Sequence, residues 1–275
     1  MLATAWQLQF QPASKSRGRL YYFTSHLRVV TALVIREMST RFGKNPGGYL
    51  WALLEPIAYI AFMSLIFMAI AHKPALGTSF PLFFASGFVC FQFYAAMASY
   101  LNSAVNANRS LLSYPNVAPI DTIAARFSLQ FCTTCVVAVC IITPLIMQLK
   151  TTPNIRLSPI IIAITLGSLI ALGLALANNV LFQRFPLYEK IFGIVSRPLF
   201  LISGIFYLPD SLPPAARDAI LINPIAHLVM LFRTGIYPEY RAIGFDLDYL
   251  LSVTTVFLFA GMAVFTISRG VLRAR

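Results

Sequence analysis

The stretch RFGKNPGGYLWALLEP, from Arg41 to Pro56, contains three signals in immediate succession. Basic residues come first, an Asn-Pro-Gly-Gly sequence follows, and a long apolar run begins at Tyr49. Proline lacks a backbone N–H and glycine tolerates unusual dihedral angles, so we expect a sharp turn between Asn45 and Gly48. The stretch therefore predicts an interfacial helix that bends into a membrane-spanning one, with Tyr49 and Trp51 at the membrane surface.

The composition of the whole chain also indicates a membrane protein. Of its 275 residues, 58% are hydrophobic and 11% are charged, and the mean hydropathy is +0.75. A soluble domain carries about 25% charged residues, so this chain has too few to cover a surface that faces water. The net charge of +12 does not indicate nucleic-acid binding, because the basic residues lie mostly in short connections between apolar runs. We expect one all-α integral membrane domain over residues 1–275.

Six segments are long enough to cross a bilayer, which takes about 20 residues. They run from Tyr49 to Ala71, Phe80 to Tyr100, Ile123 to Gln148, Leu157 to Phe182, Ile191 to Tyr207 and Tyr249 to Ser268. The side that carries the N-terminus then holds 15 lysines and arginines and the other side holds 6, which together make the 21 of the chain. Cytoplasmic loops hold such an excess, so both termini are predicted to be cytoplasmic. The first 20 residues contain no recognisable cleavable signal peptide.

The residues before the first span form a predicted amphipathic helix over 24–44. Leu27, Val30, Val34 and Met38 fall on one stripe, and basic residues occupy much of the remainder, as in a helix that lies among lipid headgroups. We expect cytoplasmic tails over residues 1–23 and 271–275, and a six-helix membrane region over 45–270.

The segment from Ala219 to Ile236 is apolar but interrupted by Asn223-Pro224, and it carries His227 and Arg233. Broken helices with polar residues are tolerated at membrane depth only where protein or water covers them. We interpret the segment as a re-entrant hairpin on the outer side, between the fifth and sixth spans. A full span is the alternative, but it would place the basic C-terminal sequence SRGVLRAR outside.

The sequence lacks the motifs of an enzyme. The pair Gly43-Lys44 does not belong to a P-loop, because Met38 occupies the position of the first glycine, so we do not expect this chain to bind ATP in that way. No H-E-x-x-H, G-x-S-x-G or paired-carboxylate cluster is present, and no metal or cofactor is expected. Cys132 and Cys135 form a C-x-x-C, but within an apolar run we interpret them as packing residues.

Two kinds of residue in the spans are candidates for a transport path. Glu55 is interpreted as a partner of Arg126, as part of an aqueous pathway, or as a carboxylate at headgroup level, and these interpretations remain open. Aromatic side chains are interpreted either as a lining on which a sugar polymer slides or as ordinary lipid contacts and helix packing. With Glu55, the channel-lining candidates are Tyr59, Phe62, Phe67, Phe91, Tyr94 and Tyr100, and Phe93 belongs to the same aromatic group.

The loop NANRSLLSYPNVAPIDTIAARF joins the second and third spans. Residues Arg109 to Tyr114 are predicted to form a short helix with Leu111 and Leu112 on one face, ended by Pro115. Asp121 is expected to cap the helix of the third span. A compact helix presented to the cytosol is a surface on which another protein can act, although an ordinary connector is the alternative.

Three motifs, IREMSTRFGKNPGGYLWALLEPI, NRSLLSYPNVAPIDTIAARF and NPIAHLVMLFRTGIYPEY, together resemble the permease subunit of type-two ATP-binding-cassette exporters. Within that family the capsular polysaccharide export group is the most similar, and the motifs extend from Ile35 to Tyr240. The resemblance implies a homodimer that moves a lipid-anchored polysaccharide outward across the bacterial inner membrane. It implies two separate nucleotide-binding subunits that hold ATP and Mg²⁺, as well as periplasmic and outer-membrane partners.

The resemblance also implies roles for particular residues. The residues expected to couple the permease to the ATPases are Arg36, Arg41, Arg109, Ser110, Leu111, Leu112, Ser113, Tyr114 and Pro115. The candidates for an outer gate are Tyr207, Pro224, His227 and Arg233. A channel is expected between two copies, lined by the first, second and fifth spans. Near its entrance, Arg36, Arg41 and Lys44 either attract an anionic headgroup or act as topology signals.

Other functions remain open at the level of sequence. The sequence only weakly distinguishes a capsular polysaccharide exporter from a permease of the same architecture that carries O-antigen, another glycan, a lipid or a drug. An accessory membrane protein without transport activity is a second class, and a membrane enzyme is a third. The enzyme is the least supported of these, because the acid, base and nucleophile that it needs are absent.

Overall fold

The computed structural model describes residues 19–42, 47–71, 73–114, 117–149, 153–268 and 270, and within these ranges the regular elements are all helical. The helices are α1 (Arg19–Phe42), α2 (Gly48–Ile70), α3 (Phe80–Asn102), α4 (Ala104–Ala107), α5 (Pro119–Met147), α6 (Leu157–Arg184), α7 (Pro186–Leu199), α8 (Pro214–Leu221), α9 (Pro224–Ile236) and α10 (Leu247–Ile267). Short 3-10 turns follow at η1 (Arg109–Ser113), η2 (Leu201–Ser203) and η3 (Pro209–Ser211). The all-α prediction is confirmed.

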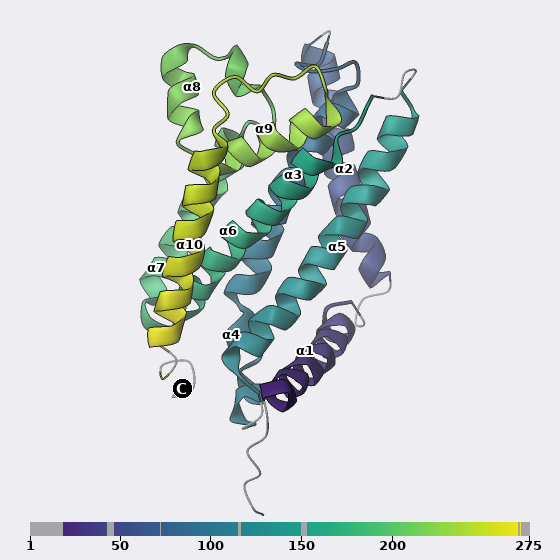
Figure 1. Cartoon of the computed structure of the whole chain (residues 1–275). Coiled ribbons are helices and arrows are strands. Elements are labelled where there is room, and N and C mark those ends of the chain that lie inside the picture. The colour runs from purple at the N-terminus through teal and green to yellow at the C-terminus, as the bar shows by residue number, and fades with distance from the viewer. Residues whose placement is uncertain are drawn as a thin grey trace, which may run out of the picture.

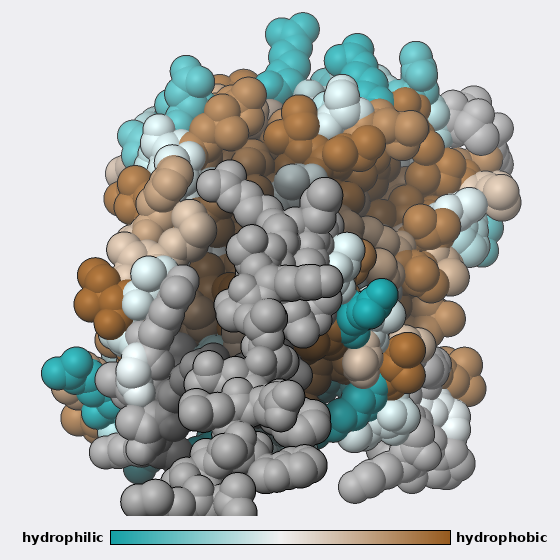
Figure 2. Space-filling view, turned by 60° about the horizontal axis from the view of Figure 1, so that its bottom comes forward, coloured by the Kyte–Doolittle hydropathy of each residue, from teal (hydrophilic) through white to brown (hydrophobic). Residues whose placement is uncertain are grey.

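Five of these helices have the length and apolar composition of membrane spans, namely α2, α3, α5, α6 and α10. They correspond to five of the six predicted spans. Helices α8 and α9 bend by 99° at the break between them, and counting this pair as one span brings the number to six. In Figure 2, apolar residues predominate over the part of the surface that is in view, and hydrophilic residues gather at the top and toward the lower left and right edges.

The predicted fifth span, Ile191 to Tyr207, is not one continuous helix. Helix α7 has 14 residues and a length of about 21 Å, shorter than the hydrocarbon core of about 30 Å. Pro198 lies inside its last turn, and Gly204, with a φ of +71°, ends the helical path after η2. In Figure 1 this bent segment still carries the chain from the end of α6 toward α8 at the opposite end of the bundle.

The two ends of the bundle differ in what they carry (Figure 1). Helices α1 and α4 and the C-terminal end of α10 lie at one end, here called the α1 end, whereas α8 and α9 lie at the other, the α8 end. Asn223 caps α9 by accepting a hydrogen bond from the Ile225 N–H at 3.0 Å, and Pro224 follows as the first helical residue. The sharp bend agrees with the predicted hairpin.

Helix α5 begins earlier than predicted. Asp121 was expected to cap it, but Pro119 is its first residue and Ala118 precedes it. Asp121 instead lies in the first turn and accepts a hydrogen bond from the Ala118 N–H at 2.9 Å. Proline favours the first helical position because its missing N–H is not needed there, so the helix starts at Pro119. Asp121 also lies 3.0 Å from Nδ1 of His26 on α1.

Glycines set the close approach of α6 and α10. A Cβ atom added to Gly261 would overlap the carbonyl oxygen of Gly173, and one added to Gly173 would lie 2.5 Å from the carbonyl oxygen of Phe257. The backbones of the two helices are therefore in direct contact, as small residues permit in membrane bundles. This contact fixes α10 against α6, which is the most apolar of the spans.

We predict that Gly261→Ala destabilises the protein by about 1–3 kcal/mol, because the added methyl group forces α6 and α10 apart. Unfolding in detergent micelles measures this free energy. Gly193→Ala on α7 is the matched control, since a Cβ there meets no atom within 4 Å. Equal stability of Gly261→Ala and the control would contradict the close packing.

Candidate functional site

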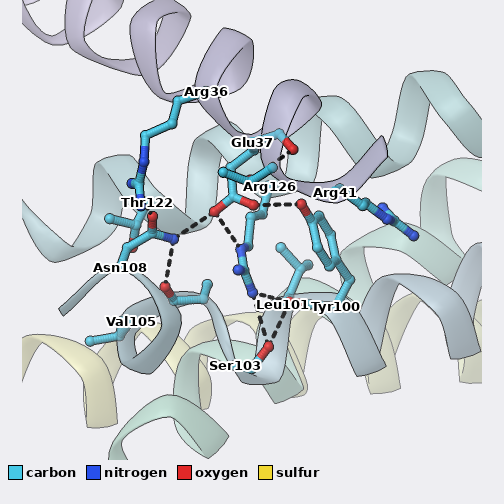
Figure 3. Close-up of polar contacts among 12 residues, drawn as sticks. Arg36, Glu37, Arg41, Tyr100, Leu101, Ser103, Val105, Asn108, Thr122 and Arg126 are labelled. Atoms are coloured by element: carbon cyan, nitrogen blue, oxygen red, sulfur yellow. Dashed lines mark hydrogen bonds and ion pairs between the residues drawn. The ribbon is translucent and has the colours of Figure 1, made fainter. Parts of the chain in front are cut away.

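A buried carboxylate on α1 organises the α1 end of the bundle. Glu37 exposes only 6% of its surface. Its Oε1 accepts hydrogen bonds from Arg126 Nε at 2.9 Å and from Asn108 Nδ2 at 2.7 Å, and its Oε2 accepts one from the Tyr100 hydroxyl at 2.8 Å. These partners come from α5, from the junction of α4 and η1, and from α3 (Figure 3). We call Glu37, Tyr100, Asn108 and Arg126 the Glu37 cluster.

Arg126 is satisfied by more than the carboxylate. Its Nη1 donates to the Tyr100 carbonyl at 3.0 Å and to Ser103 Oγ at 2.9 Å, and its guanidinium lies 4.5 Å from the centre of the Tyr100 ring. A buried ion pair is favourable only when its remaining donors and acceptors also find partners. The side chain thus joins α5 to the end of α3 as well as to α1.

Two arginines of α1 lie on either side of the cluster in Figure 3. Arg36 Nη1 donates to Asn108 Oδ1 at 2.8 Å, and Arg41 Nη1 donates to Gln130 Oε1 at 2.6 Å. The Arg41 guanidinium also lies 4.2 Å from the centre of the Tyr100 ring. Both residues, expected from the resemblance to act in ATPase coupling, therefore help to hold α1 on the bundle.

The environment keeps Glu37 ionised. Burial raises the pKa of the carboxyl group, but hydrogen bonds from Asn108, Arg126 and Tyr100 and the charge of Arg126 lower it by more. The net result is a pKa below the ordinary value of 4.5. The group is therefore charged at neutral pH, as its pairing with Arg126 requires.

Sequence reasoning did not single out Glu37. The predicted stripe on α1 is exposed at Leu27 and Met38, by 57% and 39%, as a face toward lipid should be. A second face, with Leu33 and Glu37 one turn apart, packs on the bundle instead. The available signal was the spacing of Leu33 and Glu37, four residues apart in a helix with otherwise basic charges.

The structure excludes one interpretation of Glu55. Arg126 pairs with Glu37, so the suggested pairing of Glu55 with Arg126 is wrong. Glu55 is exposed and makes no hydrogen bond or ion pair within the described parts of the chain. It lines a groove between α2, α3 and α5 together with Tyr100. The aqueous-pathway and headgroup interpretations are untouched by this.

The predicted short helix after α3 is present as η1. Arg109, Ser110, Ser113 and Tyr114 are exposed, Tyr114 by 59%. Leu111 and Leu112 are half-buried, and Leu112 packs against the hydrophobic core. The surface available to a partner is thus the polar and aromatic side of η1 rather than its two leucines. Pro115, and Lys44 near the α1–α2 bend, lie outside the described residues.

The aromatic channel candidates other than Tyr100 lie in different environments. Phe91 and Tyr94 line a groove of about 580 Å³ between α3, α6 and α7, here called the α3–α7 groove. Tyr59 stacks on Phe88 at 4.6 Å, and Phe67 packs on Phe84 at 4.8 Å, so both belong to the contact of α2 with α3. Phe62 is exposed, and Phe93 is buried against Phe131.

The α3–α7 groove combines aromatic rings with amides. Its aromatic side chains are Phe91, Tyr94, Phe182 and Phe192, and its amide side chains are Asn102, Asn106, Asn179 and Gln183. Arg109 and Glu189 also line it, so it reaches the segment that contains η1. Asn179 already donates to two backbone carbonyls and accepts from the Val105 N–H, so it is the other three amides that can exchange hydrogen bonds with hydroxyl groups. Aromatic faces pack on apolar ones, and together these groups suit weak contacts with a carbohydrate.

The outer-gate candidates lie at the α8 end. Arg233 is completely buried and donates to the carbonyls of Gly204 at 2.7 Å, Ile205 at 2.8 Å and Tyr207 at 3.2 Å. This side chain therefore holds the irregular segment after η2. His227 has different partners, the Leu221 carbonyl at 2.8 Å and the Asp246 N–H at 3.2 Å. The structure thus joins Arg233 to Tyr207, and it joins His227 to the start of α10.

The fold defines a polytopic helical membrane protein whose first helix is fastened across one end of the bundle. A family model described as "ABC-2 type transporter" matches residues 28–237. The chain belongs to the ABC-2 type transporter family.

Curated relatives extend the comparison over nearly the whole chain. The polysialic acid transport protein KpsM of Escherichia coli is 36% identical over 241 residues, which cover 86% of this chain and 92% of that protein. The capsule polysaccharide export inner-membrane protein BexB of Haemophilus influenzae is 28% identical, covering 82% of this chain and 88% of BexB. The capsule polysaccharide export inner-membrane protein CtrC of Neisseria meningitidis serogroup A is 26% identical, covering 86% of this chain and 89% of CtrC.

We predict that Glu37→Ala and Arg126→Ala each lower the free energy of unfolding by about 3–5 kcal/mol, because each leaves a buried charge without its partner. The double variant should lose less than the sum, with a coupling energy of about 2 kcal/mol. Chemical unfolding in detergent measures all four proteins. Glu189→Ala, which removes an exposed carboxylate on α7, is the control. Additive losses would contradict a direct pair.

Proposed function

We propose that this chain is the membrane-spanning subunit of an ATP-driven exporter that moves a lipid-anchored capsular polysaccharide outward across the bacterial inner membrane. The observation that carries the proposal is the similarity to capsule-export inner-membrane proteins over more than four-fifths of the chain. The sequence has no P-loop, so ATP and Mg²⁺ are held by two separate nucleotide-binding subunits. In this assignment the chain is a transport subunit and not an enzyme.

The polymer is proposed to pass between two copies of the chain. Helices α2, α3 and α7 line the path, and the α3–α7 groove forms its inner part. Helix α7 has no buried residue, and Leu187 and Ile194 are exposed by 69% and 66%, so a second copy has an apolar face to cover. Weak contacts with aromatic rings and amides allow a polymer to slide, whereas tight binding in one register would stop it.

The α1 end is proposed to face the cytoplasm and the ATPases, since the basic residues predominate on that side. Arg109 and Tyr114 supply exposed contact points, and the Glu37 cluster joins them to α1, α3 and α5. Movement of the ATPases then displaces α1 and η1 as one rigid body. Because Tyr100 and Asn102 lie at the end of α3, this displacement changes the width of the α3–α7 groove.

The α8 end is proposed to face the periplasm. Arg233 and Tyr207 shape the exit there, and His227 and Pro224 fix the angle of the hairpin. Periplasmic and outer-membrane partners continue the path from this end.

The proposed function is tested in a capsulated bacterium that encodes this protein, by deleting its gene and then expressing the intact chain again. We expect the deletion strain to accumulate polymer inside the cell and to lose surface capsule, and expression of the intact chain to restore it. Immunostaining of intact and permeabilised cells distinguishes the two locations. Normal surface capsule in the deletion strain, with another glycan or a lipid retained instead, would assign a different substrate.

The coupling role is tested separately by Arg109→Glu combined with Tyr114→Ala. Both side chains are exposed, so the variant should fold normally but lose co-purification with the ATPase subunits. Arg241→Glu, an equal charge reversal at an exposed position beyond α9, is the control and should retain them. Unchanged association of the double variant would remove η1 from the ATPase contact.

A further inference from the structure

A second groove, between α2, α3 and α5, is polar although three membrane spans form it. Its volume is about 570 Å³, within the range of about 300–1,000 Å³ that small-molecule sites occupy. The polar side chains that line it include Arg41, Glu55, Gln92, Gln130, Thr133 and Thr134. We call it the α2–α5 groove. The polymer path proposed above runs along the α3–α7 groove instead, although Glu55 and Tyr100 were channel-lining candidates and Arg41 a coupling candidate.

Polar side chains between membrane spans need partners in protein, water or lipid headgroups, because lipid tails offer none. Gln130 is satisfied, since it accepts from Arg41 and donates to Thr134 Oγ1 at 2.9 Å. Gln92 and Glu55 are not, as neither makes a hydrogen bond or ion pair within the described ranges. The exposed Glu55 carboxylate and the half-buried Gln92 amide therefore face the same space and have hydrogen-bonding capacity left for an occupant.

The groove carries one charge of each sign. Arg41 is held at the α1 side by Gln130 and the Tyr100 ring, and Glu55 lies on α2 without an ion-pair partner among the described residues. A purely anionic ligand would be repelled by Glu55, and a purely cationic one by Arg41. The arrangement suits a zwitterion with a phosphate near Arg41 and an ammonium group near Glu55.

The height of the groove matches a lipid headgroup. Trp51, which is 62% exposed, lies one turn before Glu55, and exposed tryptophans favour the membrane interface. Glu55 is seven residues into α2, about 10 Å along the helix from Gly48. Val137 and Ala138 on α5 line the same groove and offer an apolar surface to acyl chains.

We propose that the α2–α5 groove binds a zwitterionic phospholipid of the surrounding leaflet, of the phosphatidylethanolamine type. Its phosphate contacts Arg41 and its ammonium group donates to the Glu55 carboxylate, which leaves the acyl chains along α2 and α5. Three ammonium hydrogens suit a carboxylate acceptor better than a quaternary ammonium group does. The bound lipid would contact Arg41 and Tyr100, which belong to the fastening of α1.

The full chain in lipid nanodiscs tests this with two photoactivatable lipids, phosphatidylethanolamine and phosphatidylglycerol, each with a diazirine next to the glycerol. We expect the first to label peptides covering residues 92–103 and 130–138 about fivefold more than the second, as an ion pair near a surface allows. Even labelling of all lipid-facing helices, without headgroup preference, would overturn the site.

A charge inversion makes the assignment specific. Glu55→Lys gives the groove two cations, so it should reverse the preference toward phosphatidylglycerol, whereas Glu55→Gln should abolish the preference with no change in shape. Glu239→Lys, at an exposed carboxylate of the α8 end, is the matched control and should behave like the unaltered chain. Unchanged labelling in both Glu55 variants would contradict the proposal, whatever polymer the protein exports.

Discussion

The buried carboxylate of Glu37 must be paired, and the arrangement of the α1 end follows from that requirement. An ionised group with 6% exposure costs far more than a hydrogen bond contributes unless each oxygen is satisfied. Glu37 meets this condition only when α1 lies against α3, α5 and the α4–η1 junction at once. An interfacial helix that lipid alone could hold in many orientations therefore has one position on this bundle.

The same rule operates at the α8 end with opposite charge. Arg233 is completely buried and is satisfied by backbone carbonyls of the segment after η2 rather than by a carboxylate. Between the two ends, apolar contacts suffice, such as the Gly173–Gly261 approach and the stacking of Tyr59 on Phe88. Charged side chains thus determine the shape of both ends, and apolar packing determines much of the middle.

The sequence predicted what depends on local composition. Five spans, the α1 amphipathic helix and the break at Asn223-Pro224 were predicted because apolar length and proline act within a few residues. The fifth span was wrong as a single helix, because hydropathy does not register the turn that Pro198 and Gly204 impose. The Glu37 cluster was missed because the partners of Glu37 lie 63 to 89 residues away, and no local pattern selects Glu37 over Glu55 as the partner of Arg126.

We infer that α1 and the α4–η1 junction move as one rigid body. The most direct measurement is the distance between spin labels at Ser39 on α1 and Ser113 on η1, in a variant without the native cysteines and assembled with its ATPases. With and without trapped ATP, we predict one narrow and unchanged distance distribution, even as distances from either label to α9 change. A shift of the Ser39–Ser113 distance on ATP binding would contradict the claim.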